Sequence, residues 1–444
     1  MKFGGTSVGK PERMHDVAKL ITNDNEQKIV VLSAVSGTTN ALVEIGNLLA
    51  QHKKAEAKNK IDGLEQQYQA FIRELVQQPE ALADASEVLR EHFEFLNIIL
   101  RISFSEALSK DILAQGELIS TKLFSIYLRE QGIEHELLFA LDFMSTDQND
   151  EPQVELIRER LRELLKDHAD KKLFITQGYI CRNTRGEVDN LKRGGSDYSA
   201  SLIAAAINAS VCEIWTDISG MHNNDPRLVD STFPIEKLSF DEAAELAYFG
   251  AKILHPASIW PAQQYKIPVK LLNTMEPDAK GTIITEDAAS EGVKAVAAKD
   301  GITSVNIRSS RMLLAYGFLR KVFEVFEKFR TPIDMITTSE VAVSVTVDTD
   351  IALPQIVKEL ERFSTVEVKK NQTIVCVVGN HIGGMPGTLK KIFDSVSSID
   401  VRMVSFGGSQ HNVSMLVNAE DKKTVLQGLN KGLFRLANPS NDGA

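Results

Sequence analysis

A glycine turn near the start of the chain contains the first residues whose types could do chemistry. Gly4 and Gly5 follow Lys2 and precede Thr6-Ser7 and a pattern typical of a helix. Glycines at such a turn let backbone N–H groups approach phosphate oxygens closely, and Lys2 places a cation beside them. The segment lacks both the GK[ST] ending of a Walker loop and the GxGxxG pattern. It is either a phosphate cradle or a tight strand-to-helix turn that needs glycine.

The segment RGGSDYSA at 193–200 combines a cation with a helix start. We predict Ser196 as the N-cap of the apolar helix 200–209, so that free N–H groups and the positive helix end face the same region as Arg193. This arrangement predicts an anion site, and a plain capped helix is the alternative. Asp197 is unfavourable beside a phosphate unless it is paired, so we expect it to orient one of the lysines.

Further polar residues follow an apolar run that ends at Trp215. Thr216 and Asp217 come directly after this run, at the edge where α/β sheets bind ligands. The later tripeptide 225–227, which ends in an arginine, indicates either a nucleotide contact or an ordinary turn. Lys252 supplies a second candidate cation, although a lone lysine is more often solvated surface.

The elements that must position these residues follow two patterns. Short apolar runs alternate with helical patterns up to about residue 285, which predicts an α/β domain whose mainly parallel sheet has helices on both faces. These runs lie at 29–32, 173–175, 211–215 and 267–271. A long polar segment from about 40 to 130 has apolar residues at helical spacing, and we interpret it as a helical subdomain beside the sheet.

An internal repeat organises the rest of the chain. GFLRKVF at 317–323 is echoed by GTLKKIF at 387–393, and SEVAVSVTVD at 339–348 by SQHNVSMLVN at 409–418, each pair being 70 residues apart. This predicts two small α+β modules related by duplication, each with a helix and two strands. We expect a first domain at 1–285, followed by modules at 293–370 and 371–440.

Composition narrows the classes of function. The chain has 444 residues, more than the roughly 250 to 300 that one hydrophobic core usually organises, so we expect two or more domains. Its content of 43% hydrophobic and 25% charged residues is typical of globular proteins. A net charge of −10 argues against binding to nucleic acid or a membrane surface, which leaves small molecules as ligands. Cys181, Cys212 and Cys376 fit neither a disulfide framework nor a zinc site. Without a signal pattern or a long apolar run, we expect a cytoplasmic protein.

Taken together, the motifs resemble those of the aspartate kinases, most closely the monofunctional, lysine-inhibited type. The ordered series is KFGGTSVGK at 2–10, VLSAVSGTTN at 31–40, QGELIS at 115–120, RGGSDYSA at 193–200, TDISGMHNNDPR at 216–227 and AYFGAKILHP at 247–256. The C-terminal duplication resembles that family's paired ferredoxin-like ACT domains. The resemblance implies transfer of the γ-phosphoryl group of ATP to the β-carboxylate of L-aspartate, the first step of lysine, threonine and methionine biosynthesis.

The resemblance also implies a role for each matching residue. Lys2, Asp197 and Lys252 would be catalytic; Thr39, Glu117, Arg193 and Ser196 would bind aspartate; Lys2, Gly4, Gly5, Thr216, Asp217, His222, Arg227 and Lys252 would line the nucleotide side. The attacking carboxylate, with an ordinary pKa of about 3.9, is already ionised at neutral pH, so no general base is required. Mg²⁺ would bridge the ATP phosphates, and we assign it no side-chain ligand.

Regulation follows from the same likeness. Met312, Gly317, Phe318, Leu319, Asp334 and Ser339 would bind inhibitory lysine, with Asp334 pairing with its ammonium. We expect a homodimer formed through the ACT modules, and modules that serve only dimerisation are the alternative. The sequence departs from the family at His222, where tyrosine is common, at Lys192, where glycine is frequent, and at Lys2, which directly follows Met1. Another kinase of the superfamily and an amino-acid sensor with a decayed kinase domain are the competing interpretations.

Overall fold

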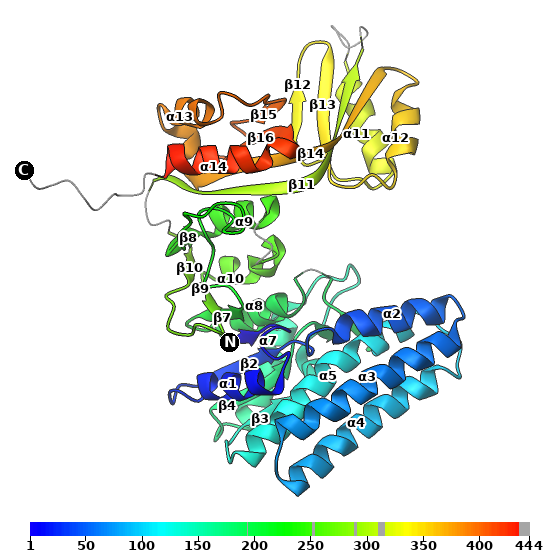
Figure 1. Ribbon diagram of the computed structural model, residues 1–444. Helices are drawn as coiled ribbons and strands as arrows, with labels where there is room; N and C mark the ends of the chain where they lie inside the picture. The colour runs from blue at the N-terminus through cyan, green and yellow to red at the C-terminus, as the bar shows by residue number, and fades with distance from the viewer. Residues whose placement is uncertain (193, 251–253, 288–290, 310–315, 435–444) are drawn as a thin grey trace, which may run out of the picture. The chain divides into compact units, whose positions relative to one another are not determined.

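A computed structural model describes residues 1–192, 194–250, 254–287, 291–309 and 316–434 (Figure 1). The chain forms two compact units. Unit 1 consists of Met1–Met221, Glu236–Phe240 and Ile253–Asp287, and unit 2 consists of His222–Ile235, Asp241–Lys252 and Ala288–Ala444. Within the described ranges, no helix combines the length and apolar character needed to cross a membrane.

Unit 1 is built on an eight-stranded sheet of order β3-β4-β2-β1-β7-β9-β10-β8. All neighbouring strands run parallel except β9 and β10. The strands are β1 (Lys2–Phe3), β2 (Lys28–Leu32), β3 (Glu136–Leu138), β4 (Leu173–Gln177), β7 (Cys212–Thr216), β8 (Lys237–Ser239), β9 (Val269–Asn273) and β10 (Thr282–Thr285). The four predicted apolar runs correspond to β2, β4, β7 and β9, so the mainly parallel sheet is confirmed. A separate antiparallel pair joins β5 (Ile180–Arg182) and β6 (Val188–Asn190).

Alternating side chains of β2 show how both faces of this sheet are buried. Val30 and Leu32 belong to the main apolar core, together with residues of α1 (Pro11–Ile21) and α5 (Glu106–Glu130). Ile29 and Val31 point the other way and line a cavity together with α7 (Val154–Asp167) and α8 (Gly195–Ile207). A strand with helices against both faces reads as a continuous apolar run, as this one does.

The segment predicted as a helical subdomain at about 40–130 is mostly helical. It consists of α2 (Thr38–Ala50), α3 (Lys54–Leu75), α4 (Pro79–Ile99) and the long α5, which pack side by side (Figure 1). Their buried side chains recur at helical spacing, as at Ile61, Leu64, Tyr68 and Ile72 of α3. The shorter helices of the first 264 residues are α6 (Ala140–Phe143), α9 (Phe240–Phe249), η1 (Pro256–Ser258) and α10 (Trp260–Gln264).

Unit 2 contains a six-stranded antiparallel sheet of order β12-β13-β11-β14-β16-β15. Its strands are β11 (Gly292–Arg308), β12 (Ile336–Thr338), β13 (Ala342–Val347), β14 (Thr365–Asn380), β15 (Met403–Ser405) and β16 (Asn412–Asn418). Its helices are α11 (Phe318–Lys328), α12 (Leu353–Leu360), η2 (Ile382–Gly384), α13 (Thr388–Ser395), η3 (Ala419–Asp421) and α14 (Lys422–Leu433). Two separate apolar cores, one under α11 and α12 and one under α13 and α14, match the two predicted modules.

The predicted duplication is visible in the local geometry. The α11 and α13 helices each follow a glycine in the left-handed conformation, Gly317 with φ of 82° and Gly387 with φ of 81°. A residue with a Cβ atom is strained at such a φ, which explains why both copies begin with glycine. The two modules are nevertheless joined, because β11 and β14 each run through both halves of the sheet. The boundary predicted between residues 370 and 371 therefore falls inside a continuous strand.

Candidate active site

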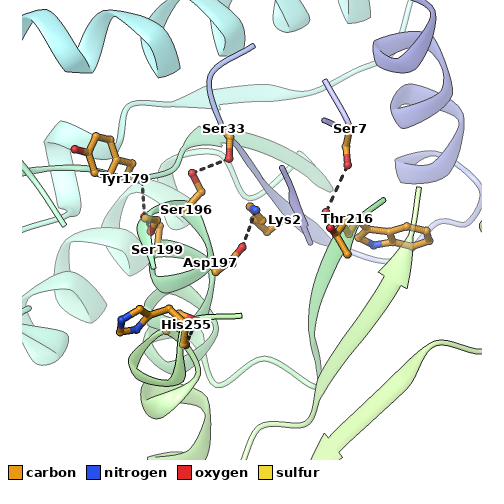
Figure 2. A network of polar contacts seen from close by, with 12 residues as sticks. Lys2, Ser7, Ser33, Tyr179, Ser196, Asp197, Ser199, Thr216 and His255 are labelled. Atoms are coloured by element: carbon orange, nitrogen blue, oxygen red, sulfur yellow. Dashed lines mark hydrogen bonds and ion pairs between the residues drawn. The ribbon is translucent and has the colours of Figure 1, made fainter. Parts of the chain in front are cut away.

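Lys2 is held at the centre of the parallel sheet. It pairs with Val31 of β2 on one side and with Ile214 of β7 on the other, although β1 has only two residues. Its Nζ lies 2.6 Å from Oδ1 of Asp197, and the two side chains are only 11% and 16% exposed (Figure 2). The sequence predicted that Asp197 would pair with a lysine, and Lys2 is the partner.

The glycine turn after β1 is required by close approach. A Cβ atom on Gly4 would lie 3.2 Å from Nζ of Lys2, and one on Gly5 would lie 3.2 Å from the carbonyl oxygen of Ala34. Any larger residue would press on the lysine or on the neighbouring loop. The turn is closed by Ser7, whose N–H donates to the Gly4 carbonyl at 2.9 Å. These contacts hold the backbone close to the charged end of Lys2.

The start of α8 faces the same region. Gly194 and Gly195 have φ of 67° and 49°, and the helix begins at Gly195. The prediction that Ser196 is the N-cap is therefore wrong, because Gly194 occupies that position and no side chain caps the helix. Ser196 instead accepts a hydrogen bond from Oγ of Ser33 at 2.8 Å (Figure 2). The positive end of α8 lies beside Asp197 in the helix's first turn, and the N–H of Asp197 donates to the Gly194 carbonyl at 3.0 Å.

Glu117 on α5 is another charged residue of this region. Its side chain is buried; Oε1 accepts from the Ala34 N–H at 3.3 Å, and Oε2 is buried without a hydrogen-bond partner. Burial raises the pKa of Glu117 to about 7. A buried carboxylate oxygen without a partner is unfavourable unless a ligand supplies a donor. Thr39 lies half-buried in the first turn of α2, next to Thr38, which packs near Gly116 of α5.

The predicted nucleotide-side residues divide between the units. Thr216 and Asp217 lie at the carboxyl end of β7 in unit 1, and Oγ1 of Thr216 donates to Oδ1 of Asp217 at 3.2 Å. His222 and Arg227 belong to unit 2. There Arg227 forms two hydrogen bonds to Asp225, at 2.9 and 2.8 Å, and burial lowers the pKa of His222.

Arg193, Lys252 and Met312 lie outside the described residues, so their proposed roles stay predictions. Some polar contacts at the site were not predicted. Oγ of Ser7 lies 2.7 Å from Oγ1 of Thr274, and the N–H of Tyr179 donates to Oγ of Ser199 at 2.7 Å. Ser33 could have been found from its sequence position, because it directly follows the apolar run that forms β2.

A second charged cluster lies in unit 2 around Asp334, whose side chain is only 2% exposed. Nζ of Lys299 lies 2.8 Å from Oδ1 of Asp334 and 3.0 Å from Oδ2 of Asp348. The Tyr248 hydroxyl also donates to Oδ1 of Asp334, at 2.7 Å, whereas Oδ2 of Asp334 is buried without a hydrogen-bond partner. The resemblance predicted Asp334 as a binding residue, but the sequence analysis missed Lys299 and Tyr248, which contact it, and Asp348, which pairs with Lys299.

The other predicted effector residues belong to the same module. Phe318 is buried in the module core, and Leu319 beside it is partly exposed at the start of α11. Ser339 is exposed, and its N–H donates to the Ala342 carbonyl at 2.8 Å. Gly317 provides the left-handed turn before α11.

The site in unit 1 thus presents a fixed cation, a helix end and a buried carboxylate with a free oxygen. Such a set can neutralise anionic oxygens and accept from an ammonium group. No group of three or more His, Cys, Asp or Glu side chains that could hold a metal occurs within the residues that the structure describes.

Comparisons with known proteins follow this division of the chain. Residues 1–273 match the amino acid kinase family, and residues 375–433 match the ACT domain. Lysine-sensitive aspartokinase 3 of Escherichia coli (strain K12) is 35% identical over 445 residues, which cover 98% of this chain and 98% of that protein. The chain belongs to the aspartokinase family.

Two solved aspartokinase structures are also similar. The E. coli aspartokinase III in complex with aspartate and ADP (R-state) has a TM-score of 0.83 and 33% identity, covering 98% of this chain and 99% of that chain. The same protein in complex with lysine and aspartate (T-state) has a TM-score of 0.81 and 34% identity, with the same coverage. As an aspartokinase, this protein is a kinase that uses ATP.

Proposed function

We propose that this protein transfers the γ-phosphoryl group of ATP to the β-carboxylate of L-aspartate, giving 4-phospho-L-aspartate and ADP. The observation that best supports this activity is the Lys2–Asp197 ion pair at the start of α8, 2.6 Å long and largely buried. It supplies a positioned cation where strands β1, β2 and β7 end together. The presence of this pair argues against the alternative of a decayed kinase domain.

The charges assign a part to each residue. Lys2 and the N–H groups at the start of α8 stabilise the transferring phosphoryl oxygens, and Asp197 positions Lys2. Oε2 of Glu117 accepts from the ammonium of aspartate, which supplies its missing partner. The β-carboxylate needs no deprotonation, so catalysis depends on placing it in line with the phosphorus. The resemblance proposes further residues for both substrates. They are Thr39, Arg193 and Ser196 for aspartate, and Thr216, Asp217, His222, Arg227 and Lys252 for the nucleotide.

Mg²⁺ fits this site as a companion of the nucleotide. Asp197, the carboxylate nearest Lys2, is already paired, and the described residues form no cluster of metal ligands. Nucleotide phosphates and water would therefore hold the ion, which would offset phosphate charge. Lys2 would stabilise the charge on those phosphoryl oxygens that do not contact the ion.

The test is turnover. Purified protein with MgATP should release ADP only when L-aspartate is present, and hydroxylamine should trap the acyl phosphate as a hydroxamate. ATP binding without aspartate-dependent ADP release would favour the decayed sensor. Release with acetylglutamate or carbamate in place of aspartate would indicate another kinase of the superfamily.

Feedback inhibition by lysine is the second part of the proposal. Asp334 and Asp348 share the single ammonium of Lys299, which leaves the cluster with a formal charge of −1 and Oδ2 of Asp334 without a partner. An incoming ammonium would satisfy both deficits. The remaining groups of the ligand would be held by Met312, Gly317, Phe318, Leu319 and Ser339. Lysine should inhibit turnover and raise the thermal midpoint. If it did neither, the alternative that the modules serve only dimerisation would be favoured.

At the position equivalent to Asp334, the second module has a cation in place of the carboxylate. The N–H of Asp334 donates to the Thr346 carbonyl, and the N–H of Arg402 donates to the Leu416 carbonyl, both at 2.9 Å. Thr346 and Leu416 are 70 residues apart, the interval of the repeat, so Arg402 occupies the position of Asp334 in the second copy. A cation there repels an ammonium, so we propose one lysine site in each chain.

We propose a catalytic domain at 1–285, ACT modules at 293–370 and 371–440, and a homodimer formed through the first module. The support for the homodimer is β12, a short edge strand of the six-stranded sheet, with Ile336 on it 36% exposed. Leu319 and Phe323 of α11 are also exposed. Exposed apolar residues on an edge strand mark a surface suited to pairing.

A further inference from the structure

Tyr248 links the Asp334 carboxylate to a helix that is not part of either ACT module. It lies on α9, and its hydroxyl donates to Oδ1 of Asp334 at 2.7 Å. Burial, together with this hydrogen bond, raises the pKa of Tyr248 to about 12, so the hydroxyl keeps its proton and acts as a donor at neutral pH. The contact joins residues 86 positions apart in the chain.

The same oxygen is shared with a cation. Nζ of Lys299 lies 2.8 Å from Oδ1 of Asp334 and 4.4 Å from the centre of the Tyr248 ring. Burial alone would lower the pKa of Lys299, but hydrogen bonds to Asp334 and Asp348 outweigh it and raise the pKa. Tyr248, Lys299 and Asp334 therefore form one charged network, in which a change at one member alters the other two contacts.

Helix α9 is attached to the six-stranded sheet at a second point. Oε2 of Glu245, one turn before Tyr248, accepts from Nδ2 of Asn412 on β16 at 2.5 Å. The helix ends at Phe249, three residues before Lys252 in the sequence, the proposed second catalytic lysine. Of these two hydrogen bonds, the one from Tyr248 is nearer in sequence to that lysine and ends on the proposed effector carboxylate.

We propose that Tyr248 is a positioning residue that transmits the occupancy of Asp334 to helix α9. This inference rests on the proposed inhibition by lysine. An ammonium arriving at Oδ2 of Asp334 withdraws charge from the carboxylate, so Oδ1 becomes a weaker acceptor for the Tyr248 hydroxyl. Lysine then favours a conformation in which α9 is held less firmly, which is the differential contact that an allosteric ligand needs.

The test uses Tyr248→Phe, which removes only the hydroxyl. Calorimetry should show the dissociation constant of lysine within about twofold of the wild-type value, while the lysine concentration for half inhibition should rise at least about tenfold, or inhibition should become incomplete. Without lysine, kcat and the KM for aspartate and ATP should not change. A residue with only a structural role would not separate binding from inhibition in this way.

Tyr265→Phe is the matched control. Tyr265 of unit 1 also donates to a carboxylate, that of Glu155, at 3.1 Å, and also lies beneath a cation, Arg158, at 5.0 Å. Its loss should leave inhibition by lysine unchanged. Normal inhibition of Tyr248→Phe would overturn the proposed link, and so would loss of lysine binding together with inhibition, because Tyr248 would then belong to the effector site itself. If the wild type neither binds lysine nor is inhibited by it, the proposed regulation fails first and the link fails with it.

Discussion

A buried lysine that pairs with an aspartate is the residue on which the proposed chemistry depends most. Lys2→Ala should lower kcat for aspartate-dependent ADP release by about 10² to 10³, because one preorganised charge near a transferring group contributes on that scale. Initial rates at saturating ATP and aspartate measure the effect.

The control is Lys19→Ala. Lys19 also forms an ion pair, with Asp16 at 2.8 Å, but its side chain is 76% exposed. This substitution should leave kcat within about twofold, since exposed pairs contribute little. Equal losses in the two variants would show that Lys2 acts through stability and not through the reaction.

Glu117 predicts a pH dependence of substrate binding. Its pKa of about 7 means that this proposed acceptor for the aspartate ammonium is protonated in mildly acidic solution. The kcat/KM for aspartate should therefore rise from pH 6 to pH 8 and level off above it, as a pH profile would show. Glu117→Gln should lower kcat/KM about 10- to 100-fold at pH 8 and remove that rise.

Stability should change with pH in the opposite direction. Because the folded pKa of Glu117 lies above its ordinary value of 4.5, the folded state holds a proton that the unfolded state releases between pH 4.5 and about 7. The penalty of ionising this buried group grows through that window and is complete above it. We compare the thermal midpoint of Glu117→Gln with that of the wild type at each pH. The difference, variant minus wild type, should therefore be larger at pH 8 than at pH 5. The reverse order would contradict the assigned cause.

At the level of elements, close packing between the turn after β4 and the first turn of α8 fixes the position at which α8 begins. A Cβ atom on Gly178 would lie 2.4 Å from Cβ of Ser196. Gly178→Ala should therefore displace the start of α8, lower the free energy of unfolding by about 1 to 3 kcal/mol and reduce kcat. Denaturant unfolding and a kinase assay check both effects.

Gly63→Ala provides the comparison on α3. A Cβ atom there meets no atom within 4 Å, so the change should stabilise the protein by about 0.5 to 1 kcal/mol and leave kcat alone. If both alanine variants behaved alike, close packing at Gly178 could not be what fixes α8.

The elements also show which features a sequence can predict. Apolar runs and the 70-residue repeat foretold β2, β4, β7, β9 and both modules, because burial on both faces and duplication leave periodic patterns. The pairing of Asp197 with a lysine followed from charge alone. The N-cap was misplaced because two glycines with positive φ precede Ser196, and sequence does not show which of three candidate residues leaves the helical conformation. The contact of Tyr248 with Asp334 depends on tertiary folding and has no local signal.

On the scale of the whole molecule, the duplication carries opposite charges at equivalent positions. Asp334→Asn should abolish inhibition by lysine with little change in kcat, whereas Arg402→Gln should leave inhibition intact. Titrating activity against lysine distinguishes the two variants. Retained inhibition in Asp334→Asn would place the ammonium elsewhere.

Assembly of the whole protein gives a further prediction. Ile336→Lys puts a charge on the exposed edge strand β12 and should convert the expected dimer to monomer, as light scattering after gel filtration would show. Phe393→Lys changes a comparably exposed residue, 37% accessible, on α13 of the second module, and should leave the dimer intact. Dissociation by the second variant alone would assign the interface to the other module.

The course of the chain through the six-stranded sheet also sets an order of events on the ribosome. Residues 293–299 of β11 are made first, yet their partners, residues 374–379 of β14, come only after the whole first module has been translated. The first module can close once β14 has left the exit tunnel, whereas the core of the second waits for α14. We therefore expect a nascent chain to enclose the proposed lysine-binding carboxylate of Asp334 in a folded module before the core of the second module forms, while residues 293–299 of β11 wait for β14.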